Sequence, residues 1–343
     1  MLMLIGSLIA AAALLGVPGE APDPSPSPSL QTIRAAVERA LVLIQKSALE
    51  YPRHRDCYSC HHQGVPTLAL TLARDRGFAI EEEAIAMAVD LASSDLGGAK
   101  ESYRQGRGQG GGATRAGYAL WTLELGQYEP DDVTAAVVEF LLIRDQDLGH
   151  WRTSSRRPPS EASPFTTTAV ALRGLKAFGT PAQQGRIAER VAAARRWLEE
   201  AEPQDTEDRV FRLWGLKLAG ASNAVICRAA DDLRKTQRDD GGWAQLDGLD
   251  SDAYATGSAL VALHLAGGLP TTDPAYCRGL AFLWKQQRDD GSWHVRSRSK
   301  PFQPYFESGF PHGPDQFLSI AASGWATAAL ALACPPMPAV EEP

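Results

Sequence analysis

The feature that most constrains this chain is an internal repeat with a period of about 45 residues. Each repeat holds two stretches whose apolar residues recur with helical spacing. The first stretch is rich in Ala, Gly and Thr, as in 116–123 and 255–263, whereas the second carries long charged side chains, as in 186–199. Slim helices suit a crowded inner ring, and helices with one charged face suit an outer ring in contact with water. The repeat therefore predicts helical hairpins that alternate between an inner and an outer layer.

These hairpins predict an all-α fold in which five to six units close on themselves as an α/α toroid, or α-α barrel. An open superhelix, as in helical solenoids, is the alternative, but the alternation of slim and bulky helices favours closure. A length of 343 residues would suit about two domains, whereas the continuous repeat indicates one toroid over 31–335. The polar segment 154–163 (SSRRPPSEAS) is expected to be a loop on one rim of the toroid.

The N-terminal segment has the pattern of a targeting sequence. Residues 1–17 are nearly all apolar and lack an internal charge, and the run is shorter than the roughly 20 residues that a membrane-spanning helix needs. We therefore expect a signal peptide at 1–21 and a Pro/Ser linker at 22–30 (APDPSPSPSL covers 21–30). The alternative is an uncleaved N-terminal membrane anchor. Both predict an exported protein in the periplasm or cell envelope, with possible association with a membrane surface; 336–343 form a short tail.

A short motif recurs after the outer helices. Residues 237–243 (QRDDGGW) and 287–293 (QRDDGSW) share the pattern Q-x3-G-x-W, and 146–151 (QDLGHW) is one residue shorter. The Gln amide can stack on the Trp ring and bond an adjacent helix, while Gly makes the turn. The motif resembles the QW repeat of squalene–hopene cyclases and related triterpene cyclases. Over roughly 60–333, this resemblance implies a terpenoid cyclase/protein prenyltransferase-like toroid and leaves the activity open.

The same resemblance extends to two further segments. Residues 308–311 (SGFP) are similar to a GTGFP stretch of squalene cyclases, which implies that Phe310 lies in a substrate cavity. Residues 250–253 (DSDA) keep three positions of the D-x-D-D motif with which class II cyclases protonate an alkene. The resemblance implies Asp252 as the proton donor and Asp250 as its partner in an isomerase or lyase with an incomplete acid motif. The alternative is that both carboxylates cap a helix beginning at Tyr254.

The chemically most specific motif is 57–62 (CYSCHH). Two thiols with this spacing can add to the two vinyl groups of one haem, and the adjacent imidazole can then bind the iron. The motif predicts a covalent haem c at Cys57 and Cys60, with His61 as the axial metal ligand, serving electron transfer with a redox partner or sensing. Attachment outside the cytoplasm agrees with a signal peptide. An absorption spectrum of protein matured in a haem-c-competent host tests this.

Other uses of the segment 54–66 remain open. Zinc would need a fourth ligand besides Cys57, Cys60 and His61. A redox-active pair or a structural disulfide is also possible, although five cysteines are too few for a disulfide scaffold. Together with the helical repeats, the C-x-x-C-H-H-Q sequence resembles a group of exported bacterial squalene-cyclase-like repeat proteins.

An irregular segment at 294–318 offers a sixth ligand for a haem iron. His312 is preferred there over His150, His264 and His294. Inserted loops on a rigid scaffold often carry function, and the alternative is a surface loop packed on the end of the toroid. The segment also supplies cations for haem propionates and aromatic rings for a flat ligand: Arg296, Arg298, Lys300, Phe302, Tyr305 and Phe306.

Three functions follow from these features. The first is an exported haem protein, the second an enzyme or binding protein for an isoprenoid or other apolar molecule in a central cavity, and the third a non-catalytic interaction scaffold stapled by its Cys pair. A net charge of -7 argues against a nucleic-acid partner.

Overall fold

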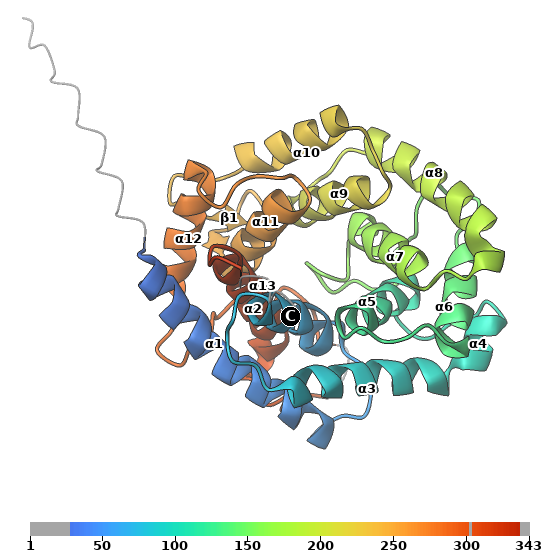
Figure 1. Ribbon diagram of the computed structural model, residues 1–343, viewed down its shortest axis with the longest axis horizontal. Helices are drawn as coiled ribbons and strands as arrows, with labels where there is room; N and C mark the ends of the chain where they lie inside the picture. The colour runs from blue at the N-terminus through green and yellow to red at the C-terminus, as the bar shows by residue number, and fades with distance from the viewer. Residues whose placement is uncertain (1–27, 302–303, 337–343) are drawn as a thin grey trace, which may run out of the picture.

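The chain forms a closed double ring of helices (Figure 1). The computed structural model describes residues 28–301 and 304–336. Each helix of the inner ring packs on the next one, and the last packs on the first, which closes the ring. The inner helices in this part of the chain are α2 (Val65–Arg74), α5 (Gly112–Leu125), α7 (Pro164–Phe178), α9 (Thr206–Leu218), α11 (Ala253–Leu265) and α13 (Gln316–Leu332).

An outer helix precedes each inner helix, so the described residues form six hairpins. A further short helix, α4 (Lys100–Arg104), packs against α6. The outer helices are α1 (Leu30–Glu50), α3 (Glu82–Gly98), α6 (Asp132–Ile143), α8 (Gln184–Glu200), α10 (Asn223–Lys235) and α12 (Pro274–Gln286). The predicted all-α toroid is therefore confirmed. The ring is closed, and the chain does not form an open superhelix.

The inner helices lie close together because small residues face their neighbours. A Cβ added at Gly117 in α5 would lie 2.8 Å from the backbone carbonyl carbon of Val170 in α7. A Cβ at Gly257 in α11 would lie 2.6 Å from the backbone of Trp325 in α13. Helix α13 is buried along its whole length after Phe317. Small side chains thus allow the backbones of inner helices to touch.

Four of the outer helices in the described part of the chain, α1, α6, α10 and α12, begin at a side-chain cap. Ser29 accepts a hydrogen bond from the Thr32 amide at the start of α1, and Asp131 forms a capping box with Thr134 at the start of α6. Along α10, the buried residues are Ile226, Ala229 and Leu233, with helical spacing. Helix α10 therefore contacts the inner ring along one stripe and exposes its charged face, whereas the more apolar α6 is buried around most of its surface.

The two full QW motifs join neighbouring outer helices. The Gln237 amide donates to the carbonyl of Gly241 in its own turn at 2.9 Å and to that of Ala275 in α12 at 2.7 Å. The Gln287 amide does the same with Gly291 at 3.1 Å and with Ala36 in α1 at 2.8 Å. The second motif therefore connects the last outer helix to the first one.

The Trp residues of the motifs are fully buried and attach the turn to the preceding helix. The indole nitrogens of Trp243 and Trp293 donate to Leu233 and Leu283 carbonyls at 3.0 and 2.7 Å. Trp151 of the shorter version makes the equivalent bond, and the Arg190 guanidinium covers its ring at 4.0 Å. After Trp243, strand β1 (Trp243–Ala244) pairs with β2 (Ser251–Asp252) in an antiparallel register that sets Trp243 opposite Asp252.

The ends of the chain fall mostly outside the described residues. The expected signal peptide, most of the linker, and residues 302–303 and 337–343 are among the undescribed ones. Helix α1 begins at Leu30, directly after the linker. In the part that the structure describes, no helix has the length and apolar character of a membrane span.

Candidate functional site

The Cys-x-x-Cys-His-His segment lies at the N-terminal end of an inner helix. After α1, a turn at Tyr51–Arg53 leads to a single π-helical turn at Cys60–Gly64, which continues directly into α2. This turn packs against α5 and α13, so the motif enters the ring of inner helices. It occupies the end of the barrel at which the inner helices begin.

The two thiols of the motif lie in different surroundings. Cys57 is exposed and Cys60 is buried, and both are free thiols. Burial raises the pKa of the Cys60 thiol well above its ordinary value, and the nearby Glu161 carboxylate raises it further. A buried, protonated thiol is a poor nucleophile, so Cys60 acts here as an apolar side chain.

His61 is held by the loop that precedes α7. Its Nε2 lies 3.0 Å from Ser160 Oγ, and its Nδ1 lies 3.4 Å from a carboxylate oxygen of Glu161. Glu161 is also paired with the Arg157 guanidinium. Ser160 and Glu161 are both buried, so this part of the loop 154–163 closes over His61.

His62 is packed as an apolar residue. It is 1% exposed, its ring lies 4.7 Å from that of Tyr51 and 5.7 Å from that of Phe317, and neither nitrogen has a hydrogen-bond partner among the described residues. Burial, with a smaller contribution from His61, lowers the pKa of His62 to about 3. His62 is therefore neutral at physiological pH.

This arrangement does not fit an attached haem. A c-type haem needs both thiols beside one porphyrin face and an imidazole nitrogen directed at the iron. Both nitrogens of His61 are engaged by Ser160 and Glu161, and only one of the two thiols is exposed. Haem attachment stays a sequence prediction. For zinc, the described part of the chain holds no group of three or more His, Cys, Asp or Glu side chains that could bind a metal ion.

The segment 294–318 places His312 against another histidine. His312 has a φ of 85°, its Nε2 lies 2.8 Å from Ser292 Oγ, and its ring stacks on His294 at 4.7 Å. Phe310 is buried and meets the His312 ring at 6.2 Å. The structure therefore gives His61 and His312 different sets of partners, and Phe310 belongs to the hydrophobic core. Helix α13 begins at Gln316, slightly before the expected end of the irregular segment.

The two Asp residues of the D-x-D-A sequence differ in their roles. Asp252 caps α11: its carboxylate accepts from the Ala255 amide at 2.9 Å and from Gln245 at 3.0 Å. Burial raises the pKa of Asp252 to about 6. Asp250 is exposed. The capping interpretation thus describes the contacts of Asp252, with the helix beginning one residue before Tyr254.

A buried carboxyl that the sequence analysis missed lies in the first turn of α9. Glu207 is 4% exposed, and its two oxygens accept from Thr166 Oγ1 at 2.8 Å and from the Tyr254 hydroxyl at 3.1 Å. Burial raises the pKa of Glu207 to about 8, so the group is protonated at neutral pH. In sequence, Glu207 follows the helix cap Asp205 and is indistinguishable from an ordinary acidic residue of a first helical turn.

Aromatic side chains fill the middle of the inner ring. The ring of Trp121 lies 5.9 Å from Tyr118 and 6.2 Å from Trp325, and Trp325 lies 6.4 Å from Phe211. We call these four residues the aromatic belt. All four are buried, and neither the Tyr118 hydroxyl nor the Trp121 indole nitrogen has a hydrogen-bond partner among the described residues.

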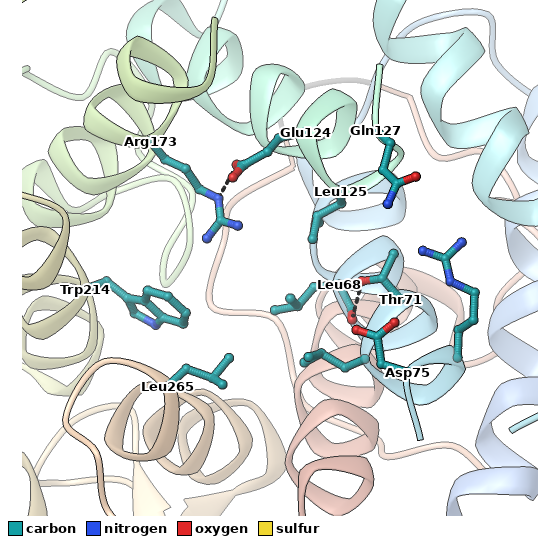
Figure 2. Close-up of a pocket in the computed structure, with 11 residues that line it drawn as sticks. Leu68, Thr71, Asp75, Glu124, Leu125, Gln127, Arg173, Trp214 and Leu265 are labelled. Carbon is teal, nitrogen blue, oxygen red and sulfur yellow. Dashed lines mark hydrogen bonds and ion pairs between the residues drawn. The ribbon is translucent and has the colours of Figure 1, made fainter. Parts of the chain in front are cut away.

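A pocket of about 380 Å³ opens at the other end of the barrel, where the inner helices end (Figure 2). Five of the inner helices contribute to it, so it lies on the axis of the toroid. Arg173, on its wall, extends over the Trp121 ring at 5.1 Å and so connects the pocket to the aromatic belt. The apolar residues that line the pocket are Leu68, Leu72, Leu125, Trp214 and Leu265. The polar residues that line it are Thr71, Arg74, Asp75, Glu124, Gln127 and Arg173.

Known proteins resemble this chain in structure but not in sequence. No protein-family model matches it, and no curated protein sequence matches it. The type II terpene cyclase MstE from Scytonema, in complex with geranylgeranyl dihydroxybenzoate, superposes with a TM-score of 0.59 at 16% identity, over 89% of this chain and 98% of that one. A protein from Actinoplanes superposes with a TM-score of 0.54 at 15% identity, over 88% and 100%.

A glycosidase structure superposes with a TM-score of 0.51 at 12% identity, over 87% of this chain and 98% of that one. These identities show the fold alone, and the same fold carries different chemistries in these proteins. The chain therefore has an α/α-toroid fold like that of a type II terpene cyclase.

Proposed function

We propose that this protein binds an isoprenoid or a similar apolar molecule in the axial pocket. The observation that carries the proposal is the pocket itself, in which leucines and Trp214 from separate inner helices converge on the barrel axis (Figure 2). Its volume of about 380 Å³ falls in the range of about 300–1,000 Å³ that is usual for small-molecule sites. Its lining combines leucines and Trp214 with polar side chains, and in small-molecule sites apolar groups supply contact area while polar groups fix the orientation of the ligand.

The similarity to MstE supports an apolar ligand of this class. That cyclase was solved with a geranylgeranyl substrate and with merosterolic acid A as its product. Both proteins have a ring of helices around an axis, and here the axis carries a leucine-lined pocket backed by the aromatic belt. Burying an isoprenoid chain against such a lining is favourable by about 25 cal/mol for each Å² of apolar surface removed from water.

The contacts favour binding over cyclisation. Asp252 and Glu207 lie at the N-terminal ends of α11 and α9, whereas the pocket lies at the C-terminal ends of the same helices. The 13 residues of α11 separate Asp252 from the end of the pocket at Leu265 by about 20 Å, at 1.5 Å per residue. Neither carboxyl lines the pocket, so neither is placed to protonate a molecule bound there.

Equilibrium binding of tritiated geranylgeraniol, delivered from cyclodextrin, tests the proposal. We expect saturable binding to the wild-type protein. Leu265→Trp fills the pocket with a larger side chain. We expect it to raise the dissociation constant about tenfold or more, which corresponds to a loss of only about 1.4 kcal/mol of binding free energy. Leu246→Trp is the matched control, because Leu246 is exposed and lies outside the pocket.

Two results would overturn the proposal. One is a folded wild-type protein that shows no saturable binding of geranylgeraniol. The other is a Leu265→Trp variant that is folded by circular dichroism and binds the alcohol as tightly as the Leu246→Trp control.

A further inference from the structure

The wall of the axial pocket carries one ion pair among its leucines. Arg173 in α7 donates from Nε to a carboxylate oxygen of Glu124 in α5. The side chains of Arg173 and Glu124 are 20% and 35% exposed, so the pair is partly shielded from water. Figure 2 shows that the two terminal amino groups of Arg173 extend into the pocket, toward the side on which Trp214 and Leu265 lie.

Arg173 has hydrogen-bond donors to spare. A guanidinium has five N–H donors, and Glu124 accepts only from Nε. Within the described residues, the terminal amino groups have no hydrogen bond to a protein acceptor, and the guanidinium lies over the ring of Trp121. A ligand oxygen inside the pocket would therefore meet unpaired donors from Arg173.

The charges around the pocket cancel. Its lining holds two cations, Arg74 and Arg173, and two anions, Asp75 and Glu124. Arg74 is already paired with Glu82 outside the pocket, at 3.0 Å. A carboxylate or phosphate head group would gain Arg173 but would lie beside Glu124, which is bonded to Arg173, and two neighbouring negative charges repel each other. A cationic head group beside Glu124 would in turn be repelled by the positive charge of Arg173.

From this balance we infer that the pocket takes an isoprenoid with an uncharged oxygen head group, a hydroxyl above all. The hydroxyl oxygen accepts from the free amino groups of Arg173, and its proton is donated to Glu124. The apolar chain then lies against Leu68, Trp214 and Leu265. This inference rests on the proposed function and adds to it the class of ligand and the two residues that select its head group.

Three probes of equal chain length separate the possible head groups: geranylgeraniol, geranylgeranoic acid and the hydrocarbon that lacks the oxygen. For the wild-type protein, we expect the alcohol to bind about tenfold more tightly than the hydrocarbon, as expected for hydrogen bonds to charged groups. The acid is expected to bind more weakly than the alcohol at neutral pH.

The test variant is Arg173→Leu combined with Glu124→Leu, which removes both charges together and leaves no unpaired one. It is expected to bind the hydrocarbon and the alcohol with equal affinity. The matched control is Arg186→Leu combined with Glu139→Leu, which removes an ion pair of the same types between the outer helices α8 and α6. The control is expected to keep the tenfold preference for the alcohol.

The outcomes distinguish this inference from the proposed function. If no probe binds, the proposed function fails. If the wild-type protein binds all three probes equally, or binds the acid most tightly, the pocket is apolar as proposed but the inferred head group is wrong. A preference for the alcohol that persists in the Arg173/Glu124 double variant would likewise contradict the roles of these two residues.

Discussion

Glu207 is a carboxyl group that the fold keeps neutral. Its oxygens accept from Thr166 and Tyr254, but no described cation is paired with it, and the side chain is buried. A carboxylic acid without a counter-ion in such surroundings retains its proton because the charged form is poorly solvated. The N-terminal end of the barrel thus holds a protonated acid, and the energetic consequence depends on pH.

We predict that Glu207→Gln stabilises the protein at alkaline pH and has little effect near pH 4. The pKa of Glu207 is raised from 4.5 to about 8 in the folded state. Between these values the unfolded chain releases the proton and the folded chain keeps it, so stability falls as pH rises, by about 1.4 kcal/mol per pH unit at most. Glutamine keeps one acceptor oxygen, its amide NH2 can donate to the other hydroxyl oxygen, and the side chain cannot ionise.

Urea unfolding between pH 4 and pH 9 measures this effect. The difference in free energy of unfolding between Glu207→Gln and wild type should grow from near zero to a few kcal/mol. Glu189→Gln, at an exposed position of α8, is the control and should show no such growth. A constant difference across the pH range would mean that Glu207 is ionised in the folded protein.

Single residues of the site were harder to predict than the repeat. The sequence placed Asp252 at a helix start, where it is indeed a cap. Glu207 sits in a similar position, yet its burial depends on Thr166 and Tyr254 from two other helices. The burial of Glu161 against His61 likewise joins segments about 100 residues apart, so no local pattern marks it.

At the scale of the elements, the QW turns require close backbone contact. Gly291 has a φ of 88°, and a Cβ there would lie 2.5 Å from the carbonyl oxygen of Arg39 in α1. Gly241 is in the same position: its φ is 85°, and a Cβ would lie 2.6 Å from the carbonyl oxygen of Arg278 in α12. Glycine is required at these turns both for the left-handed backbone and for the approach of the next helix.

We predict that Gly291→Ala destabilises the protein by about 3 kcal/mol or more, since it combines a strained φ with a backbone clash. Gly268→Ala separates the two causes. Gly268 has a φ of 74°, but nothing lies within 4 Å of an added Cβ, so its cost should be about 1–2 kcal/mol from the backbone alone. Thermal unfolding of both variants checks the difference, and equal losses would show that α1 does not press on this turn.

The helices and the QW turns were predictable because their signals are local. Alanine and glycine on α11, charged residues on α8, and Gln237 with Trp243 after α10 each lie within a short stretch of chain. The axial pocket was not predictable in this way. Leu68, Trp214 and Leu265 come from three different helices, and each looks like an ordinary apolar position of its own helix.

For the whole molecule, the N-terminal helix takes the place of a next repeat. Arg278 in α12 donates to the side-chain oxygen Oε1 of Gln237 at 2.5 Å, and Arg39 in α1 donates to Oε1 of Gln287 at 2.6 Å. The backbone acceptors are Ala275 and Ala36, each three residues before the arginine. Helix α1 therefore repeats the contacts of an internal outer helix, although it is the first helix in the described part of the chain, and the ring closes through it.

This equivalence makes closure testable. Gln237→Ala removes the contacts between α10 and α12, and Gln287→Ala removes the matching contacts between α12 and α1. In an open solenoid, losing the terminal contact would only fray one helix, because each repeat is stabilised by its immediate neighbours. In a closed ring, no helix is terminal, so we predict that both variants lower the free energy of unfolding alike, by about 1–2 kcal/mol.

Urea unfolding followed by tryptophan fluorescence measures these free energies, and hydrogen exchange of the α1 amides shows whether that helix opens alone. We expect a single transition for wild type and both variants, with α1 amides exchanging as slowly as those of α12. A Gln287→Ala variant that unfolds at the wild-type urea concentration while its α1 amides exchange rapidly would indicate that α1 is attached to an otherwise independent array. In that case the helices α2 to α13 would form the axial pocket without help from α1. The ring would then be closed by the packing of α13 on α2 alone.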